Sequence, residues 1–196
     1  MTKGASSTDA SSNTAAPAAG VSGTRLSSLP PVVAPRARVL VLGSMPGVAS
    51  LQAQRYYAHP RNLFWPMVER FLGIAATMPY EARIAALQRC GVALWDVLAH
   101  CERRGSLDGA ILRASEVANA IPSLLEAQPS LSAVVLNGQR AATSFRRHLQ
   151  AQCLRLRPML HIHVLPSTSP ANQSIPLQAR QQAWSVLADY AGPSTA

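Results

Sequence analysis

The stretch RVLVLGSMPG, residues 38–47, decides the fold class. Its first half is a short β-branched run that ends in glycine, which is typical of a strand buried inside a parallel sheet. Similar short apolar runs follow at Val92–Leu98, Leu131–Gly138 and His161–Leu165. Because helical patterns separate these runs, the sequence predicts an α/β domain whose mainly parallel sheet carries helices on both faces.

The helices are placed by their periodicity and by their stop signals. The first begins near Asn62 and ends at Gly73, and Pro66 lies in its first turn, where the missing N–H costs least. Further helices are expected over residues 79–91, 121–128, 139–150 and 177–191, and a polar loop is expected over residues 101–111.

Composition sets the domain boundaries. Residues 1–28 are rich in Ala, Ser, Thr and Gly, so we expect a disordered N-terminal tail before a single domain over residues 29–196. No apolar run approaches the roughly 20 residues that span a bilayer, and the N-terminus lacks the apolar segment of a signal peptide. We therefore expect a cytoplasmic monomer that makes no contact with a membrane.

The formal net charge is +9, and every basic residue except Lys3 is arginine. Such an excess favours a polyanionic partner, most simply nucleic acid, whose phosphates attract a basic surface. Accumulation of arginine in a GC-rich genome explains the same charge, so charge alone leaves the partner open.

Cysteine and histidine bound the metal chemistry. Cys90, Cys101 and Cys153 lack C-x-x-C spacing, which indicates reduced thiols and excludes a cysteine-only zinc or iron–sulfur site. His161 and His163 alternate along one expected strand, so their side chains face the same way. They could begin a metal site or form a hydrogen-bonded or substrate-facing pair, and we assign no metal and no cofactor.

Three unusual loops follow the expected strands, at Gly43–Asn62, Asn137–Gly138 and Pro166–Asn172. Ligands of such sheets bind beyond the carboxyl ends of the strands, where these loops meet. The first loop matches neither the phosphate-binding G-x-x-x-x-G-K-[ST] nor the dinucleotide-binding G-x-G-x-x-G pattern. A nucleotide-dependent enzyme therefore lacks its signature here.

Each residue type in these loops has a structural and a functional interpretation. Gly43 and Gly47 allow positive φ and close approach to a ligand, or simply a turn. One of Tyr56 and Tyr57 could stack on a base, although at least one of two adjacent tyrosines is expected in the core. Asn62 could cap a helix, hold a water or read a base edge.

The exit loop LPSTSPAN, residues 165–172, offers three hydroxyls between two prolines. Hydroxyls and backbone amides commonly hold DNA phosphates, although the same residues form ordinary turns. A nearby basic helix favours phosphate through Arg140, Arg146, Arg147 and His148.

In this order and spacing, GSMPGVASLQAQRYYAHPRNLFW, ALWDVL with RRGSLDGAI, VVLNG and VLPSTSPAN resemble the hypoxanthine-DNA glycosylase branch of the uracil-DNA glycosylase superfamily. The resemblance covers about Pro30 to Tyr190, and the mismatch-specific uracil glycosylases, which have a similar H-P-x-N-x-F-W box, are the close alternative. It implies a three-layer α/β/α sandwich with a central four-stranded sheet. It also implies double-stranded DNA with a flipped deaminated base, hydrolysis of the N-glycosidic bond to an abasic site, and no cofactor.

The resemblance also implies roles for individual residues. Asn62, Ser44 and Met45 match catalytic positions; Gly43, Pro46, Gly47, Tyr56, Tyr57 and Asn137 match base-binding positions; His59, Arg61, Ser167, Thr168, Ser169, Pro170 and Asn172 match DNA-binding positions.

The sequence itself constrains the mechanism. Between Asp9 and Glu69 there is no acidic residue, so the first loop supplies no strong general base. A largely dissociative reaction follows, in which Asn62 positions a weakly activated water and Asp96 is the one carboxylate considered for electrostatic help. Strand cleavage through a Schiff base needs an amine, and the only lysine is Lys3 in the expected tail, which predicts a monofunctional enzyme. A catalytically silent DNA-binding module is the alternative from another class.

Overall fold

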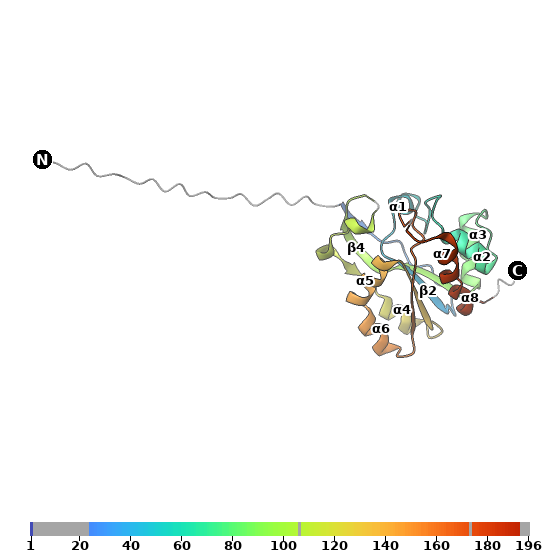
Figure 1. The fold of residues 1–196 in the computed structure, drawn as a ribbon. Coiled ribbons are helices and arrows are strands. Elements are labelled where there is room, and N and C mark those ends of the chain that lie inside the picture. The colour runs from blue at the N-terminus through green and yellow to red at the C-terminus, as the bar shows by residue number, and fades with distance from the viewer. Residues whose placement is uncertain (2–23, 106, 173, 193–196) are drawn as a thin grey trace.

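The central layer is a parallel four-stranded sheet. The computed structural model describes Met1 and residues 24–105, 107–172 and 174–192 (Figure 1). The sheet has the order β3-β2-β6-β7, and its strands are β2 (Val39–Gly43), β3 (Val92–Asp96), β6 (Ala133–Asn137) and β7 (His161–Leu165). The parallel register confirms the sheet that the sequence predicted.

The sheet carries a hydrophobic core on each face. In β2, Leu40 and Leu42 belong to one core and Val39 and Val41 to the other, because successive side chains of a strand point to opposite faces. All four side chains are fully buried. The unbroken apolar run that marked β2 in the sequence therefore reflects burial from both sides.

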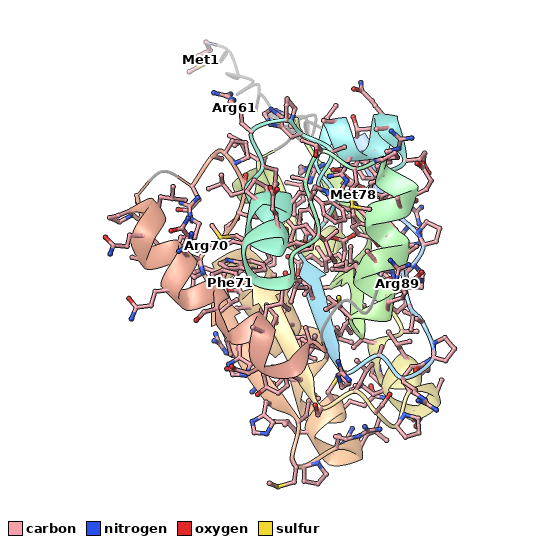
Figure 2. The ribbon with its side chains drawn as sticks, turned by 90° about the vertical axis from the view of Figure 1, so that its right-hand side faces the viewer. Met1, Arg61, Arg70, Phe71, Met78 and Arg89 are labelled. Carbon is pink, nitrogen blue, oxygen red and sulfur yellow. The ribbon has the colours of Figure 1, made fainter. Side chains whose placement is uncertain are left out.

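Helices complete the other two layers, which confirms the three-layer α/β/α sandwich. The helices are α1 (Val48–Ala53), α2 (Phe64–Leu72), α3 (Tyr80–Arg89), α4 (Ile121–Ala127), α5 (Gln139–His148), α6 (Gln150–Leu156), α7 (Leu177–Trp184) and α8 (Val186–Tyr190). Helices α4, α5 and α6 pack on one face, and α2, α3, α7 and α8 pack on the other (Figures 1 and 2). No helix in the described ranges has the length and apolar character to cross a membrane.

The end of α2 agrees with expectation, whereas three other details of the helices differ. Helix α2 ends at Gly73, whose φ of 70° is the left-handed conformation expected of a glycine stop. The closing helix is divided at Ser185 into α7 and α8. Helices α1 and α6 were not predicted; α1 spans six residues, too few for a clear periodic pattern.

A second, antiparallel sheet corrects two expectations. Its order is β1-β4-β5, formed by β1 (Thr24–Ser27), β4 (Leu98–Arg103) and β5 (Val117–Ala118). Strand β1 lies within residues 1–28, where no regular structure was expected, and the expected polar loop begins as strand β4. Both strands contain charged residues, so neither shows the apolar run that marks a buried strand. Their pairing rests on backbone hydrogen bonds, which do not depend on such a run. The rest of the expected tail, residues 2–23, lies outside the described residues.

Candidate active site

A cavity of about 510 Å³ opens at the carboxyl ends of the four parallel strands, where the three unusual loops meet. Its described lining residues are Gly43, Ser44, Met45, Pro46, Gly47, Val48, Ala49, Ser50, Tyr56, Tyr57, His59, Asn62, Asp96, Leu107, Gly109, Asn137, Ser167, Thr168, Ser169, Pro170, Ala171 and Asn172. Every expected site residue except Arg61 is in this set. Arg61 is exposed and points away from the body of the molecule (Figure 2).

The cavity also has walls that the sequence did not identify. Leu107 and Gly109 follow β4 and reach the cavity from the second sheet. Behind the first loop, Arg103 of β4 is 1% exposed, and its guanidinium donates to the carbonyl of Pro46 at 2.6 Å. Both walls come from the segment RRGSLDGAI, which contributed to the resemblance, but no site role was predicted for its residues because the second sheet was not expected.

Gly43 is required for space rather than for positive φ. It pairs with Asp96 across β2 and β3, and a Cβ at position 43 would lie 2.5 Å from Asp96 Oδ1. Neither Gly43 nor Gly47 has positive φ; the φ of Gly47 is −70°, and a Cβ there would contact nothing within 4 Å. The glycine at position 43 therefore lets a buried carboxylate approach the cavity floor.

Asp96 is the only carboxylate among the described lining residues. It is 3% exposed, and its Oδ2 accepts a hydrogen bond from Ser28 Oγ at 2.9 Å. Asn119 Nδ2 donates to the Asp96 carbonyl at 2.8 Å. The carboxylate is thus fixed in place at the end of β3, as electrostatic help to a reaction requires.

The adjacent tyrosines divide between the core and the cavity. Tyr56 is 4% exposed, its hydroxyl donates to the Leu29 and Pro30 carbonyls, and its N–H donates to Tyr80 Oη. Tyr57 turns the other way at φ 55° and stacks on Phe64, with ring centroids 3.9 Å apart. Tyr56 is therefore the core member of the pair, and Tyr57 is left as the aromatic face for a base.

Asn62 serves the start of helix α2 and also lines the cavity. The N-cap of α2 is Leu63 rather than Asn62, but Asn62 Oδ1 still accepts a hydrogen bond from Phe64 N at 2.9 Å, which holds the amide in one orientation. Among the described residues its Nδ2 has no hydrogen-bond partner. Leu63 N donates to the Thr168 carbonyl at 3.0 Å, so this box is tied directly to the exit loop.

Asn137 and Thr168 hold the exit loop against the sheet. Asn137 Nδ2 donates to Thr168 Oγ1, and Thr168 N donates to Asn137 Oδ1, both at 2.9 Å. The side chain of Thr168 is fully buried and engaged in this pair, which argues against the expected contact of its hydroxyl with DNA. Asn137 keeps one N–H and one lone pair for a ligand.

Ser167 and Ser169 remain at the mouth of the cavity. Ser167 Oγ accepts from Ser169 N, and Ser169 Oγ accepts from Ala171 N, so each hydroxyl keeps its own hydrogen to donate. A Cβ on Gly138, which has φ 100°, would lie 2.8 Å from Ser167 Cβ. The loop is therefore packed tightly, with donors suited to phosphate.

Three of the four basic side chains of helix α5 share one carboxylate, so the helix keeps a net positive charge and its expected role with phosphate stays a prediction. Glu116, whose side chain is fully buried, accepts from Arg140 at 2.5 Å and from Arg147 at 3.1 Å, and its Oε2 lies 2.8 Å from His148 Nε2. Ser144 Oγ also donates to Glu116. In this Glu116 cluster the basic groups meet a carboxylate of the same chain rather than DNA.

The histidine pair of β7 is hydrogen-bonded. His163 Nε2 lies 2.9 Å from Tyr190 Oη, and the ring planes of His161 and His163 differ by 13°. Burial and the neighbouring His161 lower the pKa of His163 below its usual 6.5. Within the described ranges no three His, Cys, Asp or Glu side chains group as metal ligands.

Comparison with known proteins adds the family. Residues 30–188 match the family model of the uracil DNA glycosylase superfamily. Two proteins named hypoxanthine DNA glycosylase are each 31% identical: one from Methanosarcina barkeri over 79% of this chain and 92% of its own, and one from Methanosarcina acetivorans over 81% and 94%. The solution NMR structure of a candidate uracil DNA glycosylase from Methanosarcina acetivorans has a TM-score of 0.71 at 28% identity, over 85% of this chain and 99% of its own.

Proposed function

This chain belongs to the uracil DNA glycosylase superfamily, and we propose that it removes hypoxanthine from deoxyinosine in double-stranded DNA and leaves an abasic site. The names of its relatives support this base. Uracil in mismatches is a second substrate to test, because uracil and hypoxanthine both present a carbonyl beside an N–H. We place the reaction in the cytoplasm, by a monomer.

One observation carries the proposal: the three loops meet around a single cavity at the carboxyl edge of the sheet. The cavity is concave and contains the aromatic ring of Tyr57 together with polar groups of Asn62, Asp96 and Asn137. A base inside a duplex cannot reach such a cavity, so the nucleotide must flip out of the stack. Ser167 and Ser169 at the mouth would then hold the phosphates of the distorted strand.

The lining chemistry supports a dissociative mechanism. The bond between the sugar carbon and the base nitrogen breaks first, and its electron pair leaves with the base. Buried Asp96 would stabilise the positive charge that develops on the sugar, since fixed charges act strongly where water is excluded. Asn62 would position the water that adds to the sugar carbon, because an amide can orient a water but cannot take its proton. The proton that the water loses balances the negative charge of the departed base.

The product is expected to be an intact strand with an abasic site. Strand cleavage by a glycosylase needs an amine that forms a Schiff base. The domain over residues 24–192 contains no lysine, because Lys3 is the only one in the sequence. The proposed enzyme is therefore monofunctional.

Single-turnover release from labelled duplexes that hold one inosine or one uracil opposite each normal base tests this function. We expect inosine to be released, with strand scission only after alkali. A preference for uracil would identify a mismatch uracil glycosylase instead. Tight binding without release from any duplex would leave the silent DNA-binding module.

Asn62 variants test the assigned mechanism. Asn62→Ala should lower single-turnover release roughly 10²–10³-fold, as the loss of a fixed polar group at a reacting centre commonly does. Asn62→Ser is the matched control, because its hydroxyl can still accept from Phe64 N–H and preserve the start of α2. If Asn62→Ser restores release along with stability, Asn62 acts only through the helix.

A further inference from the structure

The hydroxyl of Tyr57 is a buried polar group without a hydrogen-bond partner in the described parts of the chain. Leaving such a group unpaired costs about 1–3 kcal/mol, so native structures seldom retain one without a reason. The adjacent Tyr56 shows the ordinary outcome, since its buried hydroxyl donates to two backbone carbonyls. Four arginine nitrogens of the described residues are also buried without a partner, but Tyr57 is the one residue of this group that lines the cavity. Its hydroxyl is therefore the unpaired donor placed where a ligand could use it.

This hydroxyl lies at the floor of the cavity, near the end of β2. Tyr57 lines the cavity, and its Oη lies 3.9 Å from the point where a Cβ on Gly43 would sit. Asp96 Oδ1 lies 2.5 Å from that same point, so the hydroxyl and the carboxylate both flank the end of β2. A ligand that fills the cavity to its floor would therefore lie close to Tyr57 Oη, and it would reach the buried oxygen by displacing the atoms that cover it.

The fold holds the Tyr57 ring in place. Its φ of 55° is left-handed, a conformation that costs a non-glycine residue about 1 kcal/mol or more. The ring stacks on buried Phe64 at an interplanar angle of 22°. Backbone strain and stacking together prevent the hydroxyl from turning away to find a partner elsewhere.

The hydroxyl is also a donor throughout the physiological pH range. Burial raises the pKa of Tyr57 above its usual 10, and the charge of Asp96 raises it further. The side-chain amide of Asn137 lowers it by its approach to the hydroxyl, although the two groups do not reach hydrogen-bond geometry. The net effect keeps the phenol protonated. A protonated phenol can donate to a carbonyl oxygen.

We propose that Tyr57 Oη donates a hydrogen bond to the exocyclic carbonyl oxygen of the flipped base, a recognition role separate from ring stacking. This inference rests on the proposed function. Deamination replaces an amino group with a carbonyl, so a fixed donor at the floor favours the damaged base. The bond should strengthen as negative charge develops on the departing base, because hydrogen bonds to charged acceptors are stronger.

Tyr57→Phe tests the proposal because it removes one oxygen and keeps the ring. Two duplexes are compared, one with deoxyinosine and one with 2′-deoxynebularine, a purine that lacks the carbonyl. Single-turnover release of hypoxanthine should fall about tenfold or more, the effect of one hydrogen bond of roughly 1.4 kcal/mol. Release of the base that lacks the carbonyl should change less than about threefold. Equal losses on both duplexes, or no loss on either, would overturn the proposal.

Binding separates this inference from the proposed function. Affinities are measured for duplexes with uncleavable 2′-fluoroarabino analogues of the same two nucleotides, so no catalysis is needed. Tyr57→Phe should weaken binding of the inosine analogue alone. If the wild-type protein releases no base, the proposed function fails, and this difference in binding still decides the role of Tyr57.

Stability supplies the second readout. The free energy of unfolding of Tyr57→Phe should be equal to or higher than that of the wild type, since an unpaired buried hydroxyl is removed. Tyr190→Phe is the matched control, because it deletes a hydroxyl that contacts His163 away from the cavity. This control should release the base from both duplexes at the wild-type rate. A marked loss of stability in Tyr57→Phe would show that the hydroxyl has a structural partner, contrary to the proposal.

Discussion

The Glu116 cluster and the cavity are both rich in polar side chains, and they differ in how many of the contacts are made within the chain. Around Glu116, two arginines, a histidine and a serine surround one buried carboxylate. In the cavity, Tyr57 Oη and Asn62 Nδ2 have no partner among the described residues, while Asn137 keeps spare capacity. Arg140 Nε in the cluster is also buried without a partner, so an unpaired atom alone does not identify a binding site. The comparison teaches that unused capacity indicates a site where it lies in the lining of a cavity.

Glu116→Gln gives the largest expected effect on stability. The substitution leaves buried basic groups without their carboxylate, which should lower the free energy of unfolding by about 2–3 kcal/mol. This is less than for a fully buried pair, because Arg147 and His148 retain some contact with water. Denaturant unfolding measures the loss. Base release per folded molecule should stay unchanged, and a selective loss of DNA binding would show that the cluster also serves DNA.

Gly43→Ala should damage the cavity more than the fold. The added methyl group would meet Asp96 Oδ1 at 2.5 Å and displace a carboxylate that is held by Ser28. Overpacking of this kind costs about 1–3 kcal/mol, and we expect single-turnover release to fall more than about tenfold. Gly47→Ala is the control for stability, since a Cβ there contacts nothing within 4 Å. Full activity in Gly43→Ala would show that the position of Asp96 does not matter.

Thr168→Val should loosen the exit loop. The substitution removes the hydroxyl that accepts from Asn137 Nδ2 and leaves a buried amide group unpaired, at a cost of about 1–2 kcal/mol. The affinity for duplex DNA should fall along with stability, because Ser167 and Ser169 flank this residue. Thr168→Ser keeps the hydroxyl and should restore most of both. An exposed role for Thr168 would instead weaken DNA binding at unchanged stability.

Acid gives the smallest expected effect. The pKa of His163 is lowered in the folded protein, so as the pH falls below about 6.5 the unfolded chain takes up this proton first. The contribution of His163 to stability is therefore lost on acidification and regained above that pH. Unfolding of the wild type and of His163→Gln is measured between pH 5 and pH 8. The difference between their free energies of unfolding should be smaller at pH 5 than at pH 8. Parallel curves would exclude this linkage.

Sequence patterns placed the main strands and the cavity loops because their causes are local or nearly so. Strand β7 was predicted with its observed ends, and Gly73 ends α2 through its left-handed φ. Strands β1 and β4 were missed, because their pairing joins segments about 75 residues apart through backbone groups that carry no side-chain signal. With that sheet unpredicted, Arg103 and Leu107 could not be assigned to the site.

The tertiary structure alone decided between interpretations that the sequence left open. The sequence established an α/β fold, the absence of an acidic residue in the first loop and the absence of lysine from the domain, since each is a property of composition or of short-range periodicity. Contacts between distant segments determine which tyrosine is buried, how Thr168 is oriented and which carboxylate pairs with the basic residues of α5. Side-chain partnership is set by those contacts, so the roles of Tyr57 and Glu116 emerged only when the strands and loops were brought together.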